Sequence, residues 1–220
     1  MARQLRLKLQ SERLASLDEF ARGASNTRAA VAVESWPDWI GGCLAIIGPQ
    51  GSGKSHLARA WAVATGAHVV DGNSGYVSRI GNRPILIEDA DQGVADETLF
   101  HLINVAARPG GGLLLTARSR PAAWTTDLPD LRSRLNALPV VEIDAPDDVV
   151  LEGVLRKFFR DRNIRPPEEV YPYLLTRMNR SIPEAQEIVR RLDEAGDDGF
   201  RPITRMLARQ ILEENQQLDF

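Results

Sequence analysis

The chain has 220 residues, 43% of them hydrophobic and 26% charged, which is typical of a folded globular protein and not of a disordered one. No run approaches the ~20 apolar residues of a membrane span, and a net charge of −3 argues against bulk electrostatic binding to nucleic acid. The lone Cys43 cannot form an internal disulfide, and the first residues lack a signal-peptide core. We therefore expect a cytoplasmic protein.

The chain order predicts three regions. Residues 1–12 form a tail, and residues 13–145 alternate apolar runs with helical patterns, as in an α/β domain with a parallel five-stranded sheet. A short glycine-rich connection is expected at residues 72–83. The strands are predicted at Cys43–Ile47, His68–Asp71, Pro84–Glu88, Gly112–Thr116 and Pro139–Ile143.

The last third of the chain has a purely helical pattern. Asp144-Ala145-Pro146 marks a boundary, so residues 146–220 are predicted to form a small helical lid domain. Its helices are expected at Asp147–Asn163, Pro167–Met178, Ile182–Ala195 and Pro202–Asn215.

The motif with the clearest chemistry runs from Gly48 to Ser55 and reads G-P-Q-G-S-G-K-S. A buried strand before it and a helical pattern after it complete the Walker A context, the phosphate-binding loop of nucleoside triphosphate sites. Backbone N–H groups and the helix dipole face the phosphates, Lys54 reaches the β/γ-phosphates, and Ser55 ligates Mg²⁺. The predicted nucleotide-binding residues of this loop are Gly48, Pro49, Gly51, Ser52, Gly53, Lys54 and Ser55.

A second acidic motif follows the strand at Pro84–Glu88. One carboxylate can hold Mg²⁺ and the next can orient the attacking water, which predicts Glu88 as a metal residue and Asp89 as a catalytic one. The usual order in such sites is Asp before Glu, so we expect metal binding to persist and hydrolysis to be slow. The alternative is that both carboxylates only cap the next helix.

The order of these motifs resembles the AAA+ ATPases and, within them, the replication initiator DnaA. Similar segments are Leu17–Ala29, Gly48–Leu57, Leu113–Thr116 and Leu128–Leu135. The resemblance implies that Phe20 and Arg22 lie at the nucleotide base and that His56 belongs to the nucleotide-binding loop. It also implies that Arg134 is an arginine finger acting in trans on a neighbouring ATPase. Arg118 and Arg132 are rivals for that role. Pro183 stands where a sensor 2 arginine is common, so Arg180 substitutes for it or the contact is absent.

The two ends of the chain narrow the resemblance to the Hda family, the regulatory inactivators of DnaA. The sequence stops at Phe220, where a DnaA protein continues into a DNA-binding domain. Residues 4–9 read Q-L-R-L-K-L, similar to the clamp-binding peptide of that family, with Gln4, Leu5, Leu7 and Leu9 as contacts. Taken alone, the same segment also fits an edge strand.

The resemblance implies a regulator with ADP or ATP and Mg²⁺ as ligands. Its expected partners are DnaA and the DNA polymerase III β sliding clamp, and it can form a homodimer. We expect neither sequence-specific DNA binding nor association with a membrane. Two alternatives stay open. One is a self-contained AAA+ ATPase that acts as a helicase loader or transposase helper, and the other is a non-enzymatic clamp adaptor.

Overall fold

The structure is a computed structural model, and it describes residues 16–70, 83–197 and 202–218. The expected tail at residues 1–12, including Gln4, Leu5, Leu7 and Leu9, lies outside the described residues. So does almost all of the glycine-rich connection expected at 72–83.

Five parallel strands form one sheet in the order β2-β3-β4-β1-β5, which confirms the predicted fold class. The central strands β1, β3 and β4 are buried along their whole length, as expected for parallel strands covered on both faces. The strands are β1 (Cys43–Ile47), β2 (His68–Val70), β3 (Ile85–Ile87), β4 (Leu113–Ala117) and β5 (Val140–Glu142).

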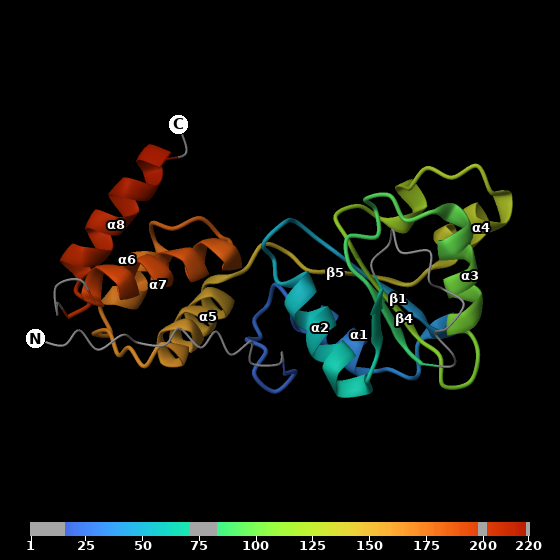
Figure 1. The fold of residues 1–220 in the computed structure, drawn as a ribbon, viewed down its shortest axis with the longest axis horizontal. Helices are drawn as coiled ribbons and strands as arrows, with labels where there is room; N and C mark the ends of the chain where they lie inside the picture. Colours follow the sequence, from blue (N-terminus) through green and yellow to red (C-terminus); the bar gives the residue numbers. More distant parts are fainter. Residues whose placement is uncertain (1–15, 71–82, 198–201, 219–220) are drawn as a thin grey trace, which may run out of the picture.

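Helices cover both faces of the sheet, giving three layers (Figure 1). They are α1 (Thr27–Glu34), α2 (Lys54–Thr65), α3 (Asp96–Ala106) and α4 (Pro129–Ala137), with the 3₁₀ turns η1 (Ile40–Gly42) and η3 (Pro121–Ala123). Successive side chains of a strand point to opposite faces. Leu44 and Leu114 accordingly join the core under α1 and α2, whereas Ala45 and Leu115 join the core under α3 and α4.

The remaining helices form a separate lobe beyond β5 (Figure 1), here called the helical part. They are α5 (Asp148–Asp161), α6 (Val170–Leu175), α7 (Ile182–Asp197) and α8 (Arg205–Leu218). Their apolar stripes pack into one core around Leu155, Phe159 and Leu192. The domain boundary expected after residue 145 stays a prediction, with β5 ending at Glu142 and α5 beginning at Asp148.

Local chemistry explains where the helices depart from their expected ends. Asp147 is the N-cap of α5, and its side chain accepts a 2.9 Å hydrogen bond from the Val150 N–H. Thr204 plays the same role for α8, accepting from the Leu207 N–H at 3.3 Å, so this helix starts after Thr204 and not at Pro202. No helix in the described ranges is long and apolar enough to cross a membrane.

Candidate nucleotide site

The loop between β1 and α2 has the backbone conformation that a phosphate-binding loop requires. Gly53 caps α2 with a φ of 99°, a left-handed conformation that glycine adopts without steric cost. A Cβ on Gly48 would lie 2.1 Å from the carbonyl oxygen of Ile143, so a larger residue does not fit there. The first N–H groups of α2 lack partners within the helix and supply a positive end for an anion.

Lys54 is buried, with 7% of its surface exposed, and it turns onto its own loop. Its Nζ donates hydrogen bonds to the carbonyl oxygens of Gly48 at 2.9 Å and Pro49 at 2.8 Å. Burial lowers the pKa of Lys54, and the nearby Asp89 carboxylate acts in the opposite direction. The ammonium is therefore held among oxygen atoms at the centre of the loop, where phosphate oxygens would bind it.

The hydroxyl of Ser52 gives an independent test of whether the loop fits a polyphosphate. Its Oγ is buried and has no hydrogen-bond partner among the described residues. A buried hydroxyl without a partner is costly. A phosphate oxygen at this position would remove that cost, so the residues present fit the ligand that the motif predicts.

The two carboxylates predicted for metal and water follow β3, next to the loop. One oxygen of Glu88, Oε2, accepts from Nε of Arg59 on α2 at 2.8 Å, while the other, Oε1, is buried without a partner among the described residues. An unsatisfied carboxylate oxygen fits a metal ion or its water. Its pairing with Arg59 was not expected from the sequence.

Asp89 has a left-handed φ of 48° and lies exposed at the turn after β3. Aspartate tolerates this conformation better than most residues. The Asp89 N–H donates to Oγ1 of Thr116 on β4 at 3.0 Å, which fixes the turn. The Asp89 carboxylate favours the charged form of Lys54 and so raises its pKa, which indicates that it lies within electrostatic range of the phosphate loop.

Asp91 was missed by the sequence reasoning. Its Oδ2 accepts hydrogen bonds from the N–H groups of Arg118 (2.9 Å) and Ser119 (3.0 Å) and from the Ser119 hydroxyl (3.1 Å). The carboxylate therefore ties the turn after β3 to the end of β4. A third acid in Glu88-Asp89-Ala90-Asp91 was the available signal, but sequence alone could not show which segment it would hold.

The segment expected at the nucleotide base contacts the helix that follows the phosphate loop. Phe20 is buried and its ring stacks on that of His56, with centroids 6.0 Å apart and planes at 16°. Burial lowers the pKa of His56, and Lys157 adds to that effect. The guanidinium of Arg22 forms an ion pair with Glu34 of α1, so its place at the nucleotide base stays a prediction.

The helical part reaches the phosphate loop through the start of α7. The Ile182 N–H donates to the carbonyl oxygen of Gly51 at 3.0 Å. Gly51, the second loop glycine, has a left-handed φ of 77°, and a Cβ there would come 2.7 Å from Oγ of Ser181, so this position favours glycine. Arg180, the candidate sensor 2 residue, instead pairs with Asp148 at 2.9 Å and donates to the Pro146 carbonyl at 3.2 Å.

The structure separates the three arginines considered for the finger role. Arg132 donates to backbone oxygens of the preceding loop, the shortest bond being 2.6 Å to Trp124, and so has a structural role. Arg134 is exposed on α4, with its guanidinium 5.0 Å from the ring centroid of Phe100. Burial raises the pKa of Cys43 to about 12, and nearby Arg134 opposes that rise.

The path of the chain places Arg134 relative to the chain's own loop. Arg134 is in the last turn of α4, and the carbonyl of Pro139, just after this helix, accepts a 2.9 Å hydrogen bond from the Ala45 N–H in β1. Cys43 begins β1, whereas the phosphate loop follows the last residue of that strand, Ile47. Arg134 therefore lies on the side of the sheet where β5 begins, whereas the phosphate loop follows the carboxyl end of β1. Arg118 is also exposed, but its positive charge lowers the pKa of Lys54, so it faces the phosphate loop of its own chain.

Compared with models of known protein families, the chain matches none. An uncharacterized protein of Haemophilus influenzae is 29% identical over 184 positions, covering 76% of this chain and 80% of that protein. The chromosomal replication initiator DnaA of Clavibacter sepedonicus is 25% identical over 232 positions, covering 92% of this chain and 49% of the DnaA. The chain thus spans about half the length of this DnaA.

Solved structures agree with the sequence matches. Domain III of Thermotoga maritima DnaA has a TM-score of 0.74 at 18% identity, covering 91% of this chain and 96% of that one. Aquifex aeolicus DnaA bound to AMPPCP scores 0.66 at 19% identity, covering 84% and 67%. Thermotoga maritima RuvB scores 0.68 at 18%, covering 90% and 71%.

These structural likenesses show the AAA+ fold, and the sequence matches relate the chain to DnaA.

Proposed function

We propose that this chain regulates the initiation of chromosome replication by stimulating ATP hydrolysis in DnaA while docked on the sliding clamp. One observation carries the proposal. Arg134 is exposed in the last turn of α4, on the side of the sheet where β5 begins, and within the described residues it is not tied to backbone oxygens as Arg132 is. The relationship to DnaA supplies the partner that such a residue would meet.

The chain's own nucleotide, ADP or ATP, would bind at Gly48–Ser55. Lys54 would exchange its bonds to the loop carbonyls for phosphate oxygens, and Ser52 would donate its free hydroxyl. Ser55 and Glu88 would hold Mg²⁺, which when bound supplies positive charge against the phosphates. The solved DnaA bound to AMPPCP supports a nucleotide in this fold.

Hydrolysis in this chain would be slow. The Glu88 carboxylate shares one oxygen with Arg59, which restrains it, and Asp89 is one methylene shorter than the glutamate usual at a water-orienting position. Arg180, already engaged by Asp148 and Pro146, is not free to contact a γ-phosphate. The nucleotide would therefore act mainly as a structural ligand, with ADP as the resident form.

Arg134 would do its chemistry in another molecule. A guanidinium beside a γ-phosphate stabilises the charge of the transition state, and such fingers raise the rate of hydrolysis by ~10³–10⁵. Gln4, Leu5, Leu7 and Leu9 would hold the chain on the clamp, with alternate leucines entering an apolar groove.

The proposal is tested by phosphate release from ATP-bound DnaA in the presence of DNA-loaded clamp. We expect strong stimulation by the wild-type chain, its loss in Arg134→Ala, and its loss on deletion of residues 1–9. Arg108→Ala is the matched control, because Arg108 is an exposed arginine of the same α/β part that follows α3. It should stimulate as wild type does.

The other function classes predict different results. A self-contained ATPase would hydrolyse ATP steadily without DnaA, and Arg134→Ala would leave its single-chain ATP binding intact. A clamp adaptor would need residues 1–9 but not Arg134. Steady turnover by the isolated chain with no effect on DnaA would contradict the proposal.

A further inference from the structure

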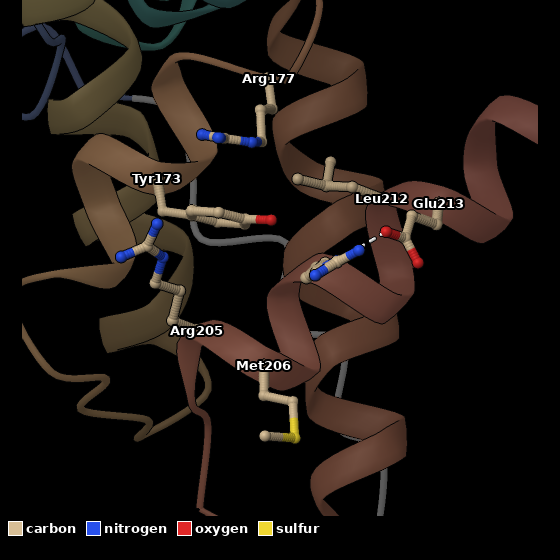
Figure 2. Close-up of a pocket in the computed structure, with 7 residues that line it drawn as sticks. Tyr173, Arg177, Arg205, Met206, Leu212 and Glu213 are labelled. Carbon is tan, nitrogen blue, oxygen red and sulfur yellow. Dashed lines mark hydrogen bonds and ion pairs between the residues drawn. The ribbon is translucent and has the colours of Figure 1, made fainter.

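A cavity of about 700 Å³ opens in the helical part, between α6 and α8, far along the chain from the nucleotide site. Figure 2 shows its lining, which combines one aromatic ring, three guanidinium groups and an exposed methionine. The lining residues are Tyr173, Arg177, Arg205, Met206, Arg209, Leu212 and Glu213.

Two of the guanidinium groups are positioned by the ring of Tyr173. Cζ of Arg177 lies 4.2 Å and Cζ of Arg205 lies 4.9 Å from the ring centroid. Figure 2 shows the ring between them. Stacking occupies the flat face of a guanidinium and leaves its N–H edge available, so the ring orders both groups without consuming most of their donors.

The cavity carries more positive than negative charge. Glu213 is the one carboxylate in the lining, and it accepts from Nε of Arg209 at 2.7 Å. Within the described ranges, neither Arg177 nor Arg205 has a carboxylate within ion-pair distance. Two guanidinium groups are therefore left to receive an anion, and each can bind a carboxylate through two parallel hydrogen bonds.

The rest of the lining favours a peptide over a nucleic acid. Met206 is 82% exposed beside the arginines and offers an adaptable apolar contact. Arginines cover the ring of Tyr173, so it cannot stack on a base as single-strand binding proteins do. The chain's net charge of −3 does not attract a polyanion at long range.

We propose that this cavity is a docking site for an acidic peptide segment of a partner protein. Two neighbouring carboxylates of the segment bind Arg177 and Arg205, and an adjacent apolar side chain packs on Met206. The site lies in the helical part and needs neither Arg134 nor the residues of the phosphate loop. Its test is therefore independent of the regulatory function proposed above.

The test is fluorescence anisotropy of the full-length chain with a labelled peptide, Gly-Asp-Asp-Leu-Phe-Gly, and with its counterpart in which both aspartates are asparagines. We expect the aspartate peptide to bind at least tenfold tighter, since charge-assisted bonds are about twice as strong as neutral ones. Arg177→Ala and Arg205→Ala should each weaken binding about tenfold, and Arg177→Lys should rescue it only in part because lysine cannot form two parallel bonds.

Two further measurements keep the result interpretable. Arg160→Ala, an exposed arginine of α5, should bind the peptide as wild type does, and circular dichroism should show that every variant is folded. Equal affinity for the two peptides, no effect of the Arg177 and Arg205 replacements, or no binding by about 1 mM peptide would overturn the proposal. Stronger competition by a single-stranded oligonucleotide than by unlabelled peptide would assign the cavity to nucleic acid instead.

Discussion

The α/β part and the helical part hold their candidate functional groups in different ways. In the α/β part the phosphate loop is one continuous segment, Gly48–Ser55, and its geometry comes from backbone conformation. In the helical part the cavity lined by Arg177 and Arg205 is assembled from side chains of α6, of the turn after it and of α8, about thirty residues apart. A backbone site can be read from a short motif, whereas a side-chain site appears only after the helices have packed.

The largest effect should come from testing whether the two parts unfold together. Leu155 is fully buried in the helical part, and replacing it with alanine should cost about 2–5 kcal/mol of stability. All four tryptophans, Trp36, Trp39, Trp61 and Trp124, lie in the α/β part. In Leu155→Ala we expect the denaturation midpoint to fall more by circular dichroism than by tryptophan fluorescence.

Leu114→Ala is the matched control for that experiment. Leu114 is fully buried in β4, so its loss should lower the fluorescence midpoint at least as much as the dichroism midpoint. Equal shifts of both signals in both variants would show one cooperative unit and would contradict the distinction between the two parts.

Because backbone conformation sets the shape of the nucleotide site, losing one side chain of the loop should weaken nucleotide binding without unfolding the protein. Lys54→Ala removes one charge that, among the described residues, is bonded to carbonyl oxygens of its own loop. We expect about 100-fold weaker binding of a fluorescent ADP analogue, since hydrogen bonds to charged groups contribute about 1.5–3 kcal/mol. The thermal midpoint should change little, and an unchanged affinity would argue against Gly48–Ser55 as the phosphate site.

Asp147 joins the two parts, and its removal should have an intermediate effect. Its carboxylate caps α5 and also accepts from the Ser25 N–H at 2.9 Å, so Asp147→Ala should cost about 1–2 kcal/mol. Burial alone would raise the pKa of Asp147, but hydrogen bonds from Ser25 and Val150 outweigh burial and the net pKa is lowered.

The sign of that shift fixes the pH dependence. A carboxyl whose pKa is depressed on folding contributes stability above its unfolded value, about 3.9, and loses it as the pH falls through the folded value. The difference in unfolding free energy between wild type and Asp147→Ala should therefore be constant near neutral pH and shrink below about pH 4. Denaturant titrations at several pH values measure it.

The smallest effect is expected from Arg59. Its guanidinium is 64% exposed in the pair with Glu88, so Arg59→Ala should change stability by less than about 1 kcal/mol. It should instead release the Glu88 carboxylate and raise the affinity for Mg²⁺ in the presence of ADP by a few fold. A titration of Mg²⁺ into the ADP complex tests this, and a weaker affinity would show that Arg59 positions Glu88 rather than restraining it.

The sequence predicted the structure best where the residues of one short segment determine its conformation. β1 begins and ends where its apolar run predicts, and α2 begins at Lys54 because the glycines before it permit the turn. It predicted side-chain positions least well where a residue distant in the sequence supplies the partner. Arg22 turns to Glu34, Arg180 to Asp148 and Glu88 to Arg59, and these pairings depend on how the elements fold together.

The hydrogen bond from the Ile182 N–H to the Gly51 carbonyl links the start of α7 directly to the backbone of the phosphate loop. The carbonyl that accepts this bond belongs to the peptide plane between Gly51 and Ser52, so the orientation of that plane decides whether the bond forms. A phosphate that turned this plane would break the bond to Ile182, while the contact between Asp147 and Ser25 would still hold the two parts together. Nucleotide binding would therefore alter one contact between the two parts without repacking either hydrophobic core.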